Sequence, residues 1–263
     1  MSSPRLWPNP PGNSPLPLPK GPSFFSRNDF LELLPPQMPE SESIDLDGLK
    51  NYIGLHTLPD GKAISDVIDL ENRRPLLIAG ELANPYRLSD IMAPDMPIIP
   101  IRLEDICRTW ADNLDGREIQ PGIHHVTIVR SPGWWERSFI TLLEIQDMKK
   151  MVQWLDGSNS NTWAPKRLAE GVIRLENDMD LLSPEFEQIS WDGKEEKVEV
   201  SMPPANGPAL DLSTVMVPIN TRSGCYNSRG RVNRCVHYLQ TDFHEKMFRR
   251  GSSFKWSDML NFL

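Results

Sequence analysis

Apolar and polar positions along the chain recur in patterns that predict both strands and helices. Short apolar runs bounded by Pro and Asp predict two buried strands, at 74–80 (RPLLIAG) and 96–102 (MPIIPIR). The β-branched run at 122–130 (GIHHVTIVR) predicts a third strand, and its alternation places neighbouring side chains on opposite faces. The Ser-Pro-Gly signal in 131–135 (SPGWW) predicts a turn directly after it.

Apolar residues at helical spacing predict five further segments. These predicted helices cover 26–34, 43–54, 102–114, 138–157 and 164–182. In 102–114, Leu103, Ile106 and Trp110 would share one helical face. The first half of 138–157 is also compatible with a strand. The chain therefore has the element content of an α+β protein, a mixed sheet with several helices.

The C-terminal third begins with the alternating run 197–202 and the Pro- and Gly-rich stretch 203–211 (PPANGPALD), which is the best linker candidate. Two strand candidates follow, 213–219 and 231–240. The predicted organisation is a disordered Pro-rich N-terminal leader, a mixed acidic body, a linker, and a basic strand-and-helix segment. Their ranges are 1–22, 23–202, 203–211 and 212–263.

Proline dominates the leader: eleven of the 25 prolines lie in the first 40 residues. The run PLPLP at 15–19 favours an extended polyproline conformation without internal hydrogen bonds. Such a segment docks into aromatic-lined grooves, so residues 10–20 are a candidate docking site for a protein partner. The alternative is a solvated leader with no specific partner.

Length and composition narrow the class of protein. The chain of 263 residues can bury an ordinary core, and its longest apolar runs are far shorter than the roughly 20 residues of a membrane-spanning helix. Proline interrupts the N-terminus too often for a secretory signal. Three cysteines fit a reducing compartment better than a disulfide framework, which favours a cytoplasmic or nuclear protein.

Charge is divided unevenly along the chain. The overall net charge is −8, but residues 220–263 carry +5 and residues 1–219 carry −13. The basic residues of this C-terminal segment are Arg222, Arg229, Arg231, Arg234, Lys246, Arg249, Arg250 and Lys255. Arginine and lysine clusters of this kind bind phosphates, so the sequence predicts contact with a polyanion, a nucleic acid or an anionic membrane, through 222–255. The alternative is that the basic residues neutralise the acidic body, internally or between subunits of an oligomer.

Two adjacent histidines interrupt the strand predicted at 122–130. On that strand His125 and Thr127 point to the same side, and His124 points to the other. His125-Val-Thr127 resembles one half of the paired His-x-Thr signature of the two-histidine phosphoesterases, in which one histidine acts as base and the other as acid. The second copy is missing here. A phosphoester hydrolase centred on His125 and Thr127 is therefore an alternative function, and a hydrogen-bonded strand histidine is the simpler interpretation.

Zinc is the other candidate chemistry. Cys225, Cys235, His237 and His244 are all residue types that ligate zinc. Their spacing, C-x9-C-x-H-x6-H, differs from compact zinc motifs, in which each ligand pair is separated by two to four residues. A zinc-stabilised binding module is a second alternative, against two ordinary thiols and two ordinary histidines.

Other chemical signatures are absent from the sequence. There is no phosphate loop, dinucleotide fingerprint, zinc-protease motif or nucleophile elbow, so the sequence predicts no cofactor. Acidic pairs such as Glu195–Glu196 are typical of solvated surfaces.

Trp134 and Trp135 follow the Ser-Pro-Gly turn signal and are candidate interface residues, with core packing as the alternative.

The best overall interpretation is a non-enzymatic structural or adaptor protein. Its leader would recruit a partner and its basic C-terminal segment would engage a polyanion. A virion matrix-type or nucleoprotein-associated protein has this arrangement, although no motif identifies one.

Overall fold

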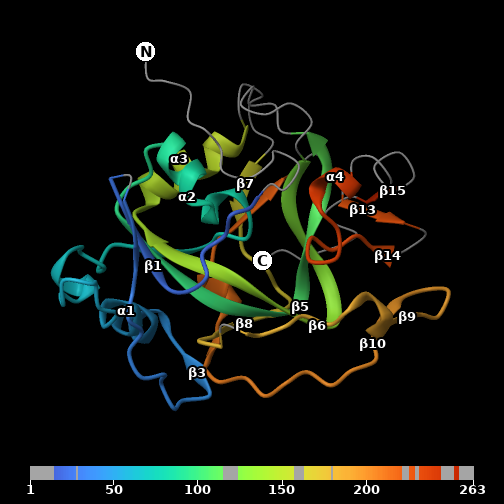
Figure 1. The fold of residues 1–263 in the computed structure, drawn as a ribbon, viewed down its shortest axis with the longest axis horizontal. Coiled ribbons are helices and arrows are strands. Elements are labelled where there is room, and N and C mark those ends of the chain that lie inside the picture. The colour runs from blue at the N-terminus through green and yellow to red at the C-terminus, as the bar shows by residue number, and fades with distance from the viewer. Residues whose placement is uncertain are drawn as a thin grey trace.

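The computed structural model describes residues 15–27, 29–114, 124–156, 163–178, 180–220, 225–228, 231–243 and 252–254 (Figure 1). Within these ranges the chain has the predicted α+β class, with a large mixed sheet flanked by helices. Residues 1–14 of the leader predicted as disordered lie outside the described residues.

The helices are α1 (Leu46–Gly54), α2 (Pro85–Asp90), α3 (Ile145–Asp156) and the short α4 (Gln240–Asp242), with 3-10 turns at Ile64–Asp66, Glu81–Ala83, Phe186–Gln188 and Leu212–Thr214. The helix predicted at 43–54 is confirmed from Leu46 onward. It begins after Asp45, whose carboxylate accepts a hydrogen bond of 2.8 Å from the Gly48 amide, as an N-cap residue does. In the part of the chain that the structure describes, no helix has the length and apolar character needed to cross a bilayer.

The strands are β1 (Ser23–Ser26), β2 (Asp29–Glu32), β3 (Ser43–Ile44), β4 (Arg74–Leu77), β5 (Met96–Leu114), β6 (His124–Leu143), β7 (Trp163–Lys166), β8 (Val172–Leu175), β9 (Ile189–Trp191), β10 (Glu196–Val198), β11 (Ala209–Leu210), β12 (Val217–Asn220), β13 (Cys225–Ser228), β14 (Arg231–Val232) and β15 (Ser252–Phe254). Eleven of the described strands form the main sheet, and the order β14-β13-β5-β8-β11-β3 runs through it. Two smaller antiparallel pairs, β9–β10 and β7–β12, lie beside it.

The long antiparallel strands β5 and β6 form the centre of the sheet (Figure 1). A bulge interrupts their pairing: Glu104 lies opposite Trp135 and Ile106 lies opposite Arg130. Between these pairs β5 has one unpaired residue, Asp105 at φ 62°, and β6 has the longer stretch 131–134; Asp105 Oδ1 accepts a 2.7 Å hydrogen bond from the Gly133 amide. The turn predicted at 131–135 is therefore an excursion within β6 rather than the end of a strand.

The helix predicted at 102–114 is wrong, because this segment belongs to β5. The bulge explains the misleading pattern. Asp105, unpaired and with a positive φ, interrupts the alternation along β5, and Leu103 and Ile106 pack in the same core cluster although they are three residues apart. Spacing of three residues is the helical signal, and here a bulge imitates it.

Two other predicted helices are also strands. Residues 26–34 form parts of the β1–β2 hairpin, which turns at Arg27 with φ 45°. The segment 164–182 contains β7 and β8, with Gly171 at φ 83° directly before β8. A Cβ on Gly171 would lie 2.8 Å from Ile106 Cγ2, so the chain turns there in close contact with β5. In 138–157 the first half is strand and the second half is α3.

Apolar side chains fill both faces of the sheet. Along β4 and the residue after it, Leu77 enters one core cluster, whereas Leu76 and Ile78 enter the other. Helix α1 covers the first face, and α2 and α3 cover the second. This three-layer arrangement buries most of β5 and β6 on both sides, including polar side chains such as Arg102 and Glu104.

The segment predicted as a linker, 203–211, is part of this body. Within it, β11 pairs with both β8 and β3. Arg102 donates hydrogen bonds of 2.7 Å to the Pro203 carbonyl and 3.3 Å to the Pro204 carbonyl. Val217, in β12, lies in the same core cluster as Leu77. The boundary predicted at 203–211 therefore does not separate two cores.

Candidate polyanion-binding segment

The basic C-terminal segment is fastened to β5 by side-chain and backbone contacts. Thr109 Oγ1 donates a 2.8 Å hydrogen bond to the Asn233 carbonyl, and Trp110 Nε1 donates one of 3.2 Å to the Tyr238 carbonyl. An isolated antiparallel bridge pairs Thr109 with Arg234. The candidate phosphate-binding residues Arg231 and Arg234 are thereby held at a defined position on the sheet. The other six lie outside the described residues: Arg222, Arg229, Lys246, Arg249, Arg250 and Lys255.

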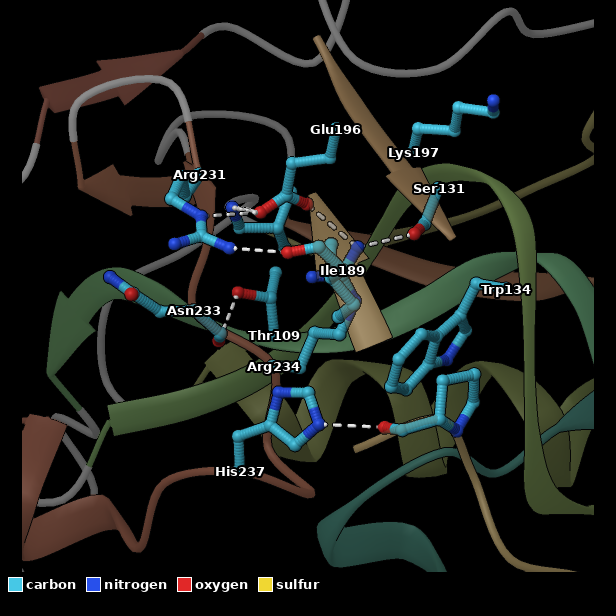
Figure 2. Close-up of polar contacts among 12 residues, drawn as sticks. Thr109, Ser131, Trp134, Ile189, Glu196, Lys197, Arg231, Asn233, Arg234 and His237 are labelled. Carbon is cyan, nitrogen blue, oxygen red and sulfur yellow. Dashed lines mark hydrogen bonds and ion pairs between the residues drawn. The ribbon is translucent and has the colours of Figure 1, made fainter. Parts of the chain in front are cut away.

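Arg234 is buried, with 2% of its side chain exposed. Its Nη2 donates hydrogen bonds of 2.7 Å to Glu196 Oε2 and 2.6 Å to Ser131 Oγ (Figure 2). The guanidinium carbon lies 4.5 Å from the centroid of the Trp134 ring, at cation–π distance. These contacts engage the Arg234 charge inside the protein, so this arginine anchors the segment and is not available to an external phosphate.

Arg231 shares the same carboxylate. Its Nε lies 3.6 Å from Glu196 Oε1, and its Nη2 donates a 2.8 Å hydrogen bond to the Ile189 carbonyl (Figure 2). The guanidinium carbon lies 4.6 Å from the ring centroid of Phe186, which is itself 40% exposed. Because 29% of the Arg231 side chain is exposed, it remains in contact with solvent at the edge of this cluster. Glu196, on the β9–β10 hairpin, therefore forms ion pairs with both arginines.

Sequence reasoning missed Glu196, because Glu195–Glu196 has the pattern of a solvated charge run. The sequence does contain a turn signal, Asp192-Gly193, with Gly193 at φ 98°. That turn folds β10 back on β9 and turns one glutamate of the pair toward the arginines. The alternative of internal neutralisation thus holds for Arg231 and Arg234.

Glu196→Ala is expected to lower the free energy of unfolding by about 2 kcal/mol, because Arg234 would keep its buried charge with Ser131 as its remaining hydrogen-bond partner. Urea unfolding followed by tryptophan fluorescence measures the change. Glu195→Ala is the matched control: it removes the exposed neighbour on the same hairpin and should shift stability by less than about 0.5 kcal/mol. Equal effects of the two variants would contradict the anchoring role of Glu196.

Two of the four candidate zinc ligands have described side chains. Burial raises the pKa of the Cys235 thiol well above its usual value, which opposes the thiolate that zinc binds. His237 Nε2 donates a 2.9 Å hydrogen bond to the Pro184 carbonyl (Figure 2). Burial lowers the pKa of this histidine. Cys225 belongs to β13, and His244 lies outside the described residues. Within the described ranges, no three His, Cys, Asp or Glu residues form a group suited to a metal ion.

His125 and Thr127 lie on the same side of β6, as the alternation predicts. His125 Nδ1 lies 3.5 Å from Glu81 Oε1, and its ring makes an edge contact with Trp163 at 5.1 Å. His125 and Thr127 are each 2% exposed. Thr127 lines a cavity of about 20 Å³, which has room for about one water molecule. A phosphoester does not fit there, so this geometry does not favour hydrolysis at His125.

His124 points to the opposite side of β6. Its Nδ1 is 2.9 Å from the Ala111 carbonyl, and its ring makes an edge contact with Phe243 at 4.8 Å. The two adjacent histidines therefore pack in two different regions, His125 against Trp163 and His124 against Phe243.

The two candidate interface tryptophans lie within the chain's own core. Trp134 is 0% exposed and Trp135 is 5% exposed. Trp134 Nε1 donates to Glu136 Oε2 at 3.3 Å, and Trp135 Nε1 donates to the Leu182 carbonyl at 2.8 Å. Each indole N–H thus has an internal acceptor, so neither ring offers a surface to a partner in this structure.

Comparison of the chain with protein-family models, with curated protein sequences and with solved structures finds no match. The function is therefore argued from the charge and geometry of the chain itself.

Proposed function

We propose that this is a non-enzymatic structural or adaptor protein that contacts a polyanion, a nucleic acid or an anionic membrane, through its basic C-terminal segment. The supporting observation is the charge balance around Glu196. Residues 220–263 carry a net charge of +5, and Glu196 contributes a single negative charge to the Arg231–Arg234 pair. The segment therefore retains most of its positive charge after this anchoring contact is made.

Anchoring matters because a phosphate-binding segment gains specificity when the protein fixes its position. Strand β13 pairs with β5, β14 and β15, so the sequence positions of Arg229 and Lys255 directly follow ordered strands of the sheet. Lysine and arginine side chains that meet phosphates release counterions, which makes such binding steeply salt-dependent. Residues 1–219, at −13, would repel a polyanion and so limit its contact to the basic C-terminal segment.

The test replaces six basic residues of the full-length chain by glutamine. The substituted residues are Arg222, Arg229, Lys246, Arg249, Arg250 and Lys255. Arg231 and Arg234 are retained because they bind Glu196. Binding to single-stranded RNA, duplex DNA and phosphatidylserine vesicles is measured across a salt titration. We expect the variant to lose about tenfold or more in affinity for the preferred probe and to show a flatter salt dependence.

A control variant removes six exposed basic residues elsewhere: Lys62, Arg74, Lys149, Lys150, Lys166 and Arg167. It changes net charge by the same amount but leaves the C-terminal segment intact. If both variants weaken binding equally, only the net charge matters and the segment is not the binding site. If the wild-type chain binds none of the three probes, the proposed function is wrong.

A further inference from the structure

Residues 15–22 of the Pro-rich leader are packed on the protein's own body. Pro15 and Pro19 are buried, and Leu18 packs against the core cluster that α2 and α3 cover. The stretch that the sequence offers as a docking peptide is therefore already in contact with a surface of the same chain.

Two polar side chains of the body donate hydrogen bonds to this stretch. Asn84 Nδ2 donates to the Pro15 carbonyl at 2.7 Å, and Arg137 Nη2 donates to the carbonyls of Pro19, at 3.3 Å, and Lys20. Proline has no amide N–H, so its carbonyl oxygens are the backbone groups through which a proline-rich chain is recognised.

Both donors are held in place by other contacts. Asn84 is 0% exposed, and its Oδ1 caps α2 by accepting from the amides of Tyr86, at 2.9 Å, and Arg87, at 3.2 Å. The Arg137 guanidinium carbon lies 5.4 Å from the Phe139 ring centroid. Rigid donors of this kind lose little conformational entropy when they bind a peptide.

A groove with a volume of about 490 Å³ lies between the leader and the body. Pro17, Leu18 and Pro19 line it on the leader side, and Phe25, Phe30 and Tyr86 contribute the body side. Its volume is within the range of ligand-binding clefts, and aromatic walls are typical of surfaces that recognise proline-rich segments. The leader forms one wall of this groove without filling it.

We propose that the surface of the body that binds Pro15–Lys20, beside this groove, is a recognition site for proline-rich peptides, which the leader occupies in cis and a proline-rich segment of another protein occupies in trans. The chain's own segment identifies the chemistry of the ligand, because Asn84 and Arg137 already bind its carbonyls. A tethered segment has an effective concentration in the millimolar range, so it competes strongly with a free peptide. Binding in trans therefore requires displacement of the leader. This site is independent of the polyanion proposal.

The test uses a fluorescent peptide with the sequence of residues 13–22, NSPLPLPKGP. Its binding to the full-length chain is measured by fluorescence anisotropy, with wild type and with a variant whose leader is weakened by Pro15→Gly, Leu18→Gly and Pro19→Gly. We expect the weakened variant to bind the peptide at least about tenfold more tightly than wild type, because the competing segment is lost. The peptide NSALALAKGA, in which alanine replaces proline, should not bind.

Asn84→Asp, added to the weakened variant, provides the specific control. Aspartate keeps the Oδ1 that caps α2 but replaces the amide donor to the peptide carbonyl, so peptide affinity should fall by about tenfold or more. Asn51→Asp, at an exposed position of α1, introduces the same charge and should leave affinity unchanged. A weakened variant that is folded, as judged by circular dichroism, but does not bind the peptide would overturn the proposal. Equal peptide affinity of the Asn84→Asp and Asn51→Asp variants would do the same.

A second measurement uses wild type alone, in case the weakened variant does not fold. Excess unlabelled peptide should accelerate amide hydrogen exchange at Leu16, Leu18 and Lys20 by releasing the leader. Unchanged exchange at saturating peptide would contradict the proposal. Self-association of wild type that the peptide reverses would identify the leader of a second copy as the occupant and would overturn the assignment to another protein.

Discussion

Glu136→Ala is expected to lower the free energy of unfolding by about 3–5 kcal/mol, because it leaves a buried charge without its partner. Glu136 is 0% exposed, at the centre of β6. Its Oε1 accepts hydrogen bonds from Arg108 at the backbone N–H, 2.8 Å, and at Nε, 2.9 Å. Trp134 Nε1 donates to its Oε2 at 3.3 Å. The truncation would leave the Arg108 charge and two N–H donors buried without this acceptor.

The control for Glu136 removes both charges of the pair. The double variant Glu136→Leu with Arg108→Leu should lose less stability than Glu136→Ala alone, because replacing a buried ion pair by apolar side chains avoids an uncompensated charge. Glu187→Ala, at an exposed position, should change stability by less than about 0.5 kcal/mol. Urea denaturation of all three variants gives the comparison. A loss below about 1 kcal/mol for Glu136→Ala would show that solvent reaches Arg108 when its partner is removed.

Elements whose signals are local could be predicted from the sequence. The helix at 43–54 forms because Asp45 supplies a cap and Leu49, Tyr52 and Ile53 lie on one buried face. The strands at 74–80 and 96–102 form where short apolar runs are bounded by turn-forming residues. In each case, the residues that determine the element lie within the element or next to it.

The sequence was misleading where distant contacts decide the conformation. Leu103 and Ile106 have helical spacing, but the bulge at Asp105 and burial between two layers make 102–114 a strand. Buried charged residues strengthen the false signal, because Arg102 and Arg108 look solvent-exposed in sequence and are 1% and 8% exposed in the fold. Arg102 donates to the carbonyls of Pro203 and Pro204 and Arg108 donates to Glu136, so these acceptors lie far outside the window of a periodicity analysis.

The candidate site shows the same division. The basic cluster of residues 220–263 is visible as composition, but its internal partner Glu196 precedes Arg234 by 38 residues. No local pattern connects them, because the contact depends on how the β9–β10 hairpin packs beside β6. The leader is similar: PLPLP is visible in the sequence, whereas Asn84 and Arg137, which donate to carbonyls of this stretch, lie 69 and 118 residues from the acceptors.

Lowering the pH is expected to destabilise the protein through His56, with an effect of about 2.5 kcal/mol between pH 7.5 and pH 4.5. Burial lowers the pKa of His56 to about 4, although the Tyr52 carbonyl opposes this shift by accepting from Nδ1 at 3.1 Å. The Nε2 atom has no hydrogen-bond partner in the described part of the chain, so protonation would bury an N–H without an acceptor. The side chain is 0% exposed.

The sign follows from the two pKa values. In the unfolded chain the histidine binds a proton below its ordinary pKa of about 6.5, whereas in the folded chain it does so only near 4. Protons therefore favour the unfolded state in this window. The stability is fully present above about pH 6.5 and is lost as the pH falls from there to the folded pKa of about 4.

His56→Asn tests this prediction, because an asparagine amide can donate to the Tyr52 carbonyl and does not titrate. Its free energy of unfolding, measured by urea denaturation at several pH values, is subtracted from that of wild type at each pH, which cancels the titration of the carboxylates. The difference should shift by about 2.5 kcal/mol in favour of the variant as the pH is lowered from 7.5 to 4.5. A difference that stays constant over this range would mean that His56 is protonated equally in both states, and that water reaches the ring at the end of α1.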